Sequence, residues 1–243
     1  MKTMNLKSAV CAAALMTLSA PALADDGPFS FAGSVTLTTD YVFRGISQTE
    51  NDPAIQGDFT LSHESGLFGT VWASNVDFDD GAEDTNLEID FTVGFGNEVN
   101  ENFSYEVGAI YYAYPDSDDD YNYVEVYFAP SFSLGAMQGH SVTLSGGIYY
   151  SPEFFADTGD AWYLTAGIAV GITDAITLDA NIGHQDIEDA IPDDYTDWNV
   201  GLTYTHEPWG TSFSVRYTDT NIGDVCANDI CDGRVVFSIS KAL

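Results

Sequence analysis

Strict alternation of apolar and polar residues recurs along most of this chain. It is clearest where apolar residues occupy every second position and Glu, Asp, Thr or Gly the positions between, at Leu87, Ile89, Phe91, Val93 and Phe95. Successive side chains of a β-strand point to opposite faces, so a period of two predicts strands with one apolar face. An amphipathic helix would repeat every 3.6 residues instead. The sequence therefore predicts an all-β protein.

The alternation predicts twelve strands. Most span nine to thirteen residues, longer than the typical five or six (about 17–20 Å) of globular sheets and close to the about 9–11 residues of a tilted membrane strand. The expected ranges are about 29–46, 54–64, 67–77, 86–97, 103–114, 121–133, 140–151, 160–171, 175–186, 196–207, 210–219 and 233–241.

The connections between these strands alternate in length. Those after even-numbered strands are short, as at Ser65-Gly66 and Thr173-Asp174, whereas those after odd-numbered strands are longer and carry 24 of the 38 carboxylates. Short turns at one end and long loops at the other are typical of bacterial outer-membrane barrels. The sequence thus predicts a twelve-stranded antiparallel up-and-down transmembrane β-barrel with both termini on the periplasmic side.

A soluble barrel with an apolar interior would show the same alternation. Charge and glycine content favour the membrane barrel, because the apolar set is too small to fill so wide an interior, whereas Gly and Thr suit a lumen. Aromatic residues near strand ends fit the girdles of a membrane barrel. These are Tyr111, Tyr112, Tyr114, Tyr149, Tyr150, Trp162, Trp198 and Tyr204.

The first 24 residues have the layout of a secretory signal peptide. Lys2 and Lys7 precede an apolar run, and Ala22-Leu23-Ala24 forms a small-x-small cleavage site. We expect cleavage after Ala24, with 25–243 forming a single barrel domain. No later apolar run reaches the length of a transmembrane helix, about 18 residues.

The chain is strongly acidic, with 38 Asp and Glu against 6 Lys and Arg. Loss of the signal leaves four cations and a net charge of −34. Nucleic-acid binding is excluded, since it needs a basic surface to neutralise phosphates. An aromatic content of 14% argues against a disordered acidic chain.

Cys226 and Cys231 are the two cysteines that remain after cleavage. In an exported protein their spacing predicts a local disulfide, with two free thiols as the alternative. A zinc site is disfavoured because no histidine lies near them in sequence. We expect neither a metal nor a cofactor.

The segment from Ser34 to Phe78 carries two motifs, Tyr41-Val42-Phe43-Arg44-Gly45-Ile46-Ser47 and Trp72-Ala73-Ser74-Asn75-Val76. Together they resemble the bacterial Gcw_chp family, also called the TorF family of porins. The resemblance covers about 45 residues directly and implies an outer-membrane protein without naming its solute. The chain departs from a common outer-membrane pattern, because it ends on Leu243 rather than on an aromatic residue.

Charged residues on the polar face of the predicted strands are the candidates for a pore constriction. An acidic ring would favour cations, and a rare arginine would set a transverse field. The alternative is that these groups neutralise one another in a narrow, largely filled lumen. Asp40 and Arg44, four residues apart on one predicted strand, would lie about 13 Å apart, too far for an ion pair. The candidates are Asp40, Arg44, Glu88, Asp90, Glu106, Asp179 and Arg216, while the facing of Asp58 and Glu125 is left open.

The acidic loops have three interpretations. They attract cationic or neutral solutes, bind divalent cations shared with lipid headgroups, or form a solvated surface suited to salty water. Asp116, Asp118 and Asp120 resemble the start of a calcium-binding loop, but Tyr121 and Tyr127 replace the Gly and Glu that an EF-hand needs.

The favoured function is a porin-like outer-membrane channel for passive diffusion of small hydrophilic solutes, preferring cations or neutral molecules. One alternative is a non-conducting structural or binding barrel that acts through its acidic loops. The best enzyme alternative is a lipid hydrolase built around His184, but no Gly-x-Ser-x-Gly motif accompanies it, and we expect no catalytic residues. The outer-membrane lipids are the expected partners, and the oligomeric state is left open.

Overall fold

The computed structural model describes residues 27–79, 84–115, 117, 121–137, 139–190 and 192–243. The predicted signal peptide and the Asp116, Asp118 and Asp120 motif lie outside the described residues.

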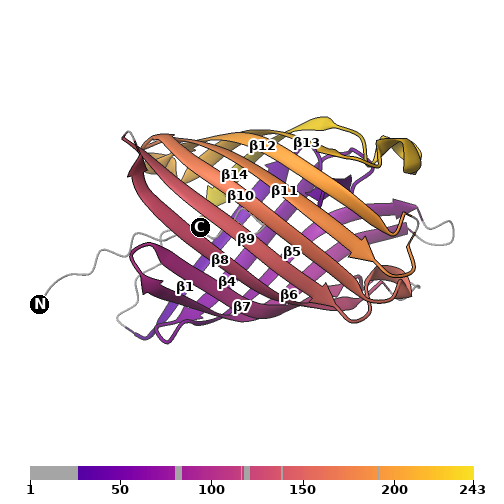
Figure 1. Cartoon of the computed structure of the whole chain (residues 1–243), viewed down its shortest axis with the longest axis horizontal. Helices are drawn as coiled ribbons and strands as arrows, with labels where there is room; N and C mark the ends of the chain where they lie inside the picture. The colour runs from indigo at the N-terminus through magenta and orange to yellow at the C-terminus, as the bar shows by residue number, and fades with distance from the viewer. Residues whose placement is uncertain (1–26, 80–83, 116, 118–120, 138, 191) are drawn as a thin grey trace, which may run out of the picture.

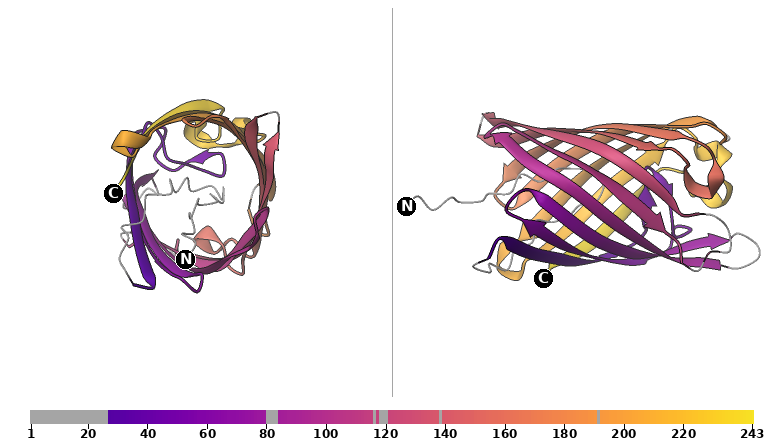
Figure 2. Two further views of the ribbon diagram at one scale, coloured as in Figure 1. Left: turned by 90° about the vertical axis from the view of Figure 1, so that its left-hand side faces the viewer. Right: turned by 90° about the horizontal axis from the view of Figure 1, so that it is seen from below.

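The fold is a closed antiparallel barrel in which each strand pairs with its neighbours in chain order (Figure 1). Strand β1 pairs with both β4 and β14, and this closes the ring (Figure 2). The twelve strands of the described chain are β1 (Phe29–Thr38), β4 (Ala54–His63), β5 (Leu67–Asp79), β6 (Asp84–Asn100), β7 (Phe103–Ala113), β8 (Tyr123–Met137), β9 (His140–Ser151), β10 (Ala161–Thr173), β11 (Ile176–Ile187), β12 (Asp194–His206), β13 (Thr211–Thr220) and β14 (Arg234–Ala242). The predicted fold class is confirmed.

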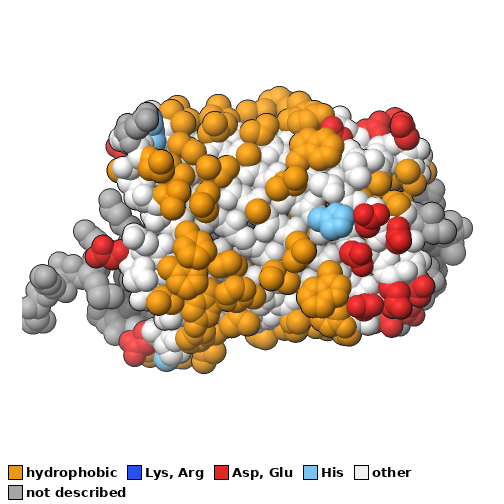
Figure 3. Space-filling view, in the orientation of Figure 1, with side chains coloured by type: hydrophobic (Ala, Val, Ile, Leu, Met, Phe, Trp, Pro, Cys, Tyr) orange, Lys and Arg blue, Asp and Glu red, His pale blue; other side chains and the backbone are white. Residues whose placement is uncertain are grey.

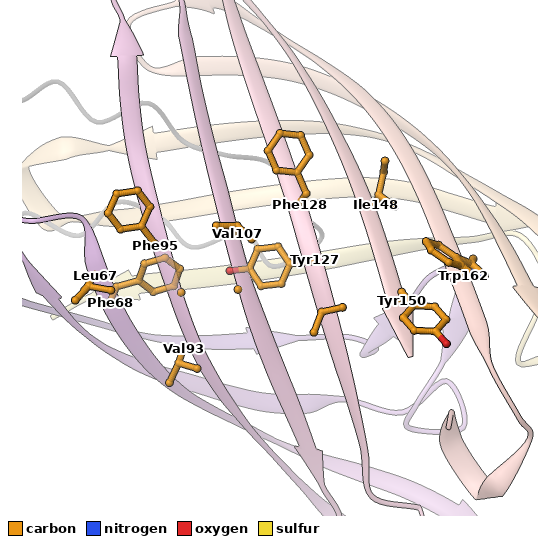
Figure 4. Close-up of a pocket in the computed structure, with 13 residues that line it drawn as sticks. Leu67, Phe68, Val93, Phe95, Val107, Tyr127, Phe128, Ile148, Tyr150 and Trp162 are labelled. Atoms are coloured by element: carbon orange, nitrogen blue, oxygen red, sulfur yellow. The ribbon is translucent and has the colours of Figure 1, made fainter. Parts of the chain in front are cut away.

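The outer wall is apolar. Side chains such as Val93 and Phe237 face outward with more than half of their surface exposed, and Figure 3 shows apolar side chains spread over the barrel wall. A shallow groove of about 700 Å³ follows β5 to β10 on this wall, bordered by Phe95, Phe128 and Trp162 (Figure 4). So much exposed apolar surface is unfavourable in water and is the surface expected in contact with lipid tails.

The two ends of the barrel differ as predicted. At one end, which we call the short-turn end, brief turns and the 3-10 helix η2 (Glu207–Trp209) join strands. The other, long-loop end carries the 3-10 helices η1 (Phe155–Asp157), η3 (Gly223–Val225) and η4 (Ala227–Asp229). Carboxylates gather at the long-loop end in Figure 3. None of the helices described here is long and apolar enough to cross a membrane.

The first predicted strand, 29–46, is wrong over residues 39–46, nearly half of its length. Strand β1 ends at Thr38, and residues 39–53 turn into the barrel, where β2 (Val42–Phe43) and β3 (Ile46–Ser47) form a short hairpin (Figure 2). We call residues 39–53 the lumenal hairpin. Its arms are extended and rich in β-forming residues, so their pattern matches that of a wall strand. The other predicted boundaries lie within four residues of the observed ones.

An aromatic core lies inside the long-loop half of the barrel. Tyr112, Tyr114 and Tyr149, expected in an outer girdle, are buried inside it instead, because they occupy the inward positions next to outward Tyr111 and Ile148. Tyr112 stacks on Tyr123 with ring centroids 4.3 Å apart. Tyr111, Trp162, Trp198 and Tyr204 do lie on the exposed outer face.

The turn of the lumenal hairpin predicts a measurable cost of substitution. Gly45 has φ of +84°, and a Cβ there would lie 2.5 Å from Cγ2 of Thr220. Gly139 has φ of +91° but no neighbour within 4 Å of such a Cβ. We expect Gly45→Ala to lower the free energy of unfolding by about 1–3 kcal/mol more than Gly139→Ala, since only the first adds overpacking to backbone strain.

Urea unfolding in lipid vesicles, followed by tryptophan fluorescence, measures this difference. Equal losses for the two variants would contradict a close contact between the hairpin turn and the wall.

Candidate functional site in the barrel lumen

The lumenal hairpin presents Arg44 at its tip. Arg44 and Gly45 both have positive φ, 47° and 84°, the combination that a two-residue type I′ turn requires. Such a φ is uncommon for arginine. The sequence predicted Asp40 and Arg44 on one wall strand, but Arg44 lies in the turn of the lumenal hairpin instead.

The guanidinium of Arg44 is buried in a pocket of the opposite wall. Its Nη2 donates to Oε2 of Glu125 on β8, and its Nη1 donates to Oε1 of Gln185 on β11, both at 2.7 Å. The rings of Tyr163 and Tyr149 lie 4.2 Å and 5.4 Å from Cζ, and Phe43 of the hairpin lies at 4.6 Å. The group thus combines an ion pair, an amide contact and cation–π contacts. We call Glu125, Gln185, Tyr149 and Tyr163 the guanidinium pocket.

Two further buried carboxylates, Glu88 and Asp90, lie on β6 in the same half of the lumen. Asp90 pairs in register with Tyr112, whose hydroxyl donates to Glu125 at 3.0 Å. Within the described chain, one oxygen of Glu88 and one of Asp90 have no hydrogen-bond partner. Buried carboxylates left in this way attract a cation or a proton.

Tyr41 and Tyr114 border Glu88 and hydrogen-bond to it. Both lie outside the wall strands. Burial, reinforced by the charge of Glu88, raises the pKa of both phenols well above the ordinary value. Their hydroxyls therefore remain protonated and act as donors at neutral pH.

The base of the lumenal hairpin is tied to the long-loop end. Asp40 accepts hydrogen bonds from Ser47 at 2.6 Å and Thr49 at 3.0 Å, and it pairs with Arg234 at 3.0 Å. A disulfide joins Cys226 to Cys231 in the loop between β13 and β14. The Ser47 amide donates to the Ile230 carbonyl beside this disulfide, at 2.8 Å.

The short-turn half of the lumen has a different lining. Arg216 pairs with Asp179 at 2.7 Å, and their side chains keep 19% and 14% of their surface exposed. Glu106 faces the lumen near Gly96, apart from the guanidinium pocket. Small inward residues such as Gly201 surround Arg216. This half is more open to water than the aromatic half.

The sequence missed several residues of the site. Asp58 and Glu125, whose facing was left open, both point inward and are buried. Asp197, which falls in the predicted strand 196–207 but is not among the lumen candidates, lies on β12, is buried, and accepts a hydrogen bond from Tyr163 at 3.0 Å. Its alternation with Trp198 could have placed it inward. The same alternation places Gln185 inward, between outward-facing His184 and Asp186, but its partner comes from a distant hairpin and leaves no sequence signal.

His184 lies on the outer surface, with 46% of its side chain exposed. It contacts Thr196 at 3.1 Å, and its Nε2 lies 3.8 Å from Asp194. Among the described residues, no group of three or more His, Cys, Asp or Glu side chains could hold a metal ion.

A family model matches residues 22–243, almost the whole chain, and is described as a bacterial protein of unknown function, Gcw_chp. The chain belongs to the Gcw_chp family. No curated protein matches it at a significant level.

Solved structures share the fold of this Gcw_chp member at low sequence identity. A NanC porin matches with a TM-score of 0.58 and 9% identity, over 87% of this chain and 98% of that one. A KdgM porin in complex with disordered oligogalacturonate matches with a TM-score of 0.55 and 11% identity, over the same shares. These likenesses concern the barrel architecture.

The buried ion pair predicts a non-additive pair of substitutions. Glu125→Ala leaves the Arg44 charge buried without its counter-ion, and we expect it to lower the free energy of unfolding by about 3–5 kcal/mol. Arg44→Ala together with Glu125→Ala removes both charges and should lose less than the sum of the two single variants, by about 0.5–3 kcal/mol.

Urea unfolding in vesicles measures all three variants. Glu98→Ala, at an exposed position near the short-turn end, serves as control and should change stability by no more than about 0.5 kcal/mol. Additive losses would mean that the Arg44–Glu125 contact contributes no coupling.

Proposed function

We propose that this protein is a porin-like channel of the outer membrane of a Gram-negative bacterium. It allows passive diffusion of small hydrophilic solutes and prefers cations or neutral molecules. The apolar wall faces lipid, residues 1–24 direct export and are removed, and passage involves no cofactor and no covalent step.

The acidic lining of the lumen is the observation that carries this proposal. Carboxylates outnumber guanidinium groups on the inward face, and fixed carboxylates lower the energy of a cation in a confined pore. The carboxylates are Asp40, Asp58, Glu88, Asp90, Glu106, Glu125, Asp179 and Asp197, and the guanidinium groups are those of Arg44, Arg216 and Arg234.

The same lining argues against acidic solutes. The KdgM porin of similar fold was solved with oligogalacturonate, a polyanion. In the present chain such a ligand would meet a carboxylate-rich mouth and further carboxylates along the lumen. Repulsion between like charges in a low-dielectric setting disfavours its entry.

A second candidate function is a non-conducting barrel that acts through its acidic loops. The lumenal hairpin and the aromatic core favour it, because they fill much of the long-loop half. If the barrel conducts, solutes must pass beside the lumenal hairpin or displace it.

Single-channel recording in planar bilayers separates the two functions. We expect discrete conductance with a reversal potential of the sign for cation preference in a KCl gradient. No conductance would favour the non-conducting barrel, and anion preference would contradict the role of the acidic lining.

A matched pair of variants localises the selectivity. Asp179→Asn removes a lumenal carboxylate that pairs with Arg216, so the reversal potential should shift toward anions. Asp224→Asn removes an equal charge from an exposed loop position and should shift it less, since the exposed charge is screened by salt. Equal shifts would place the selective charge at the mouth.

A further inference from the structure

We propose that the guanidinium pocket is a binding site for the guanidinium group of a small solute, and that Arg44 occupies it as a tethered stand-in. The proposal rests on the channel function above and names a solute class for it: small cations that carry a planar guanidinium.

The pocket belongs to the wall, whereas its occupant does not. Glu125, Gln185, Tyr149 and Tyr163 come from four strands, β8, β11, β9 and β10, whose backbones are fixed by the barrel. Arg44 arrives on the lumenal hairpin, whose strands β2 and β3 form a two-stranded sheet separate from the barrel. The pocket can therefore persist when the hairpin moves, as a site must if it is to receive a free ligand.

The chemistry of the pocket selects guanidinium over ammonium. Two oxygens 2.7 Å from separate Nη atoms match the fork of a planar group. Tyr163, with its ring 4.2 Å from Cζ, offers a face on which a flat cation stacks. A compact ammonium cannot reach both oxygens and stack on the ring at once.

Neighbouring groups extend the site beyond the stand-in. The unpartnered oxygens of Glu88 and Asp90 are buried in the same half of the lumen, and Tyr112 connects Asp90 to Glu125. Arg44 donates a hydrogen bond to neither of these oxygens. These oxygens can accept hydrogen bonds from a second donor group on the solute. An ion pair that served only to hold Arg44 in place would not need them.

The conformation of the hairpin tip favours its withdrawal from the guanidinium pocket once a solute takes its contacts. Its turn has positive φ at Arg44, a conformation that is strained for a non-glycine residue and is compensated by the contacts of the guanidinium. A solute that takes those contacts removes the compensation and favours withdrawal of the tip.

Chemical rescue tests the proposal. Purified Arg44→Ala barrel in vesicles is heated with N-ethylguanidinium, which reproduces the end of the arginine side chain, or with ethylammonium at equal concentration. We expect N-ethylguanidinium at millimolar concentration to raise the unfolding midpoint by several degrees and ethylammonium to leave it nearly unchanged. In the Arg44→Ala, Glu125→Gln variant the shift should disappear.

Equal shifts with the two cations, or a shift that survives Glu125→Gln, would overturn the proposal. Should Arg44→Ala fold poorly, the folded fraction on refolding with each cation replaces the midpoint. Recovery with N-ethylguanidinium alone supports the site, and equal recovery overturns it.

Bilayer recording then separates this inference from the channel function. With Arg44→Ala, N-ethylguanidinium should reduce the potassium current at concentrations where ethylammonium does not. If N-ethylguanidinium selectively stabilises Arg44→Ala but the barrel carries no current, the binding site is supported and the channel function is rejected. If the barrel conducts but neither cation stabilises it selectively, the channel function is supported and the binding site is rejected.

Discussion

The ion pair between Arg44 and Glu125 is the contact on which the arrangement of the lumen depends. Both side chains are almost fully buried, and removing two charges from water costs several kcal/mol per ion unless the partners are well aligned. Alignment requires β8 in the register that turns Glu125 inward, Gln185 at the correct height on β11, and a hairpin that returns from β1. The aromatic rings then exclude water from the contact. A change in any of these elements leaves a buried charge without compensation.

This requirement explains how a chain of −32 net charge uses its few cations. Arg44, Arg216 and Arg234 each pair with a carboxylate on the inner face, at three different places: the pocket, the short-turn half and the base of the hairpin. The long-loop carboxylates lie mostly at the surface, where water and salt screen them. The three paired carboxylates of the lumen therefore depend on arginine partners for their charge compensation. The exposed carboxylates of the long-loop end need no such partners, because water and salt screen them. The disulfide at Cys226 and Cys231 adds a covalent restraint to the loop that holds the hairpin base.

The period-two pattern and the alternating loop lengths predicted the barrel, its strand number and the inward facing of Glu88, Asp90 and Asp179, because each follows from backbone geometry alone. The lumenal hairpin could not be predicted in this way. The arms of the lumenal hairpin, Val42–Phe43 and Ile46–Ser47, have the residue types of a strand whether the chain continues along the wall or turns inward. The choice depends on a distant pocket of Glu125 and Gln185. Likewise, Tyr112 and Tyr149 could serve an outer girdle or an inner core, and only strand register decides between them.

Because Arg44 is tethered to the barrel, a free guanidinium solute must exceed a threshold concentration before it displaces Arg44 from the pocket. A short linker holds a group near its site at an effective concentration of about millimolar or above, so a solute of equal affinity displaces Arg44 only near that concentration. A solute that also engages Glu88 or Asp90 binds more strongly than the stand-in and competes at lower concentration. The state of the hairpin then follows from differential affinity: a ligand that uses only the contacts of Arg44 shifts the equilibrium weakly, and one that uses the unpartnered carboxylates shifts it strongly. The two unpartnered oxygens are therefore the feature by which the pocket would distinguish a permeating solute from its own arginine.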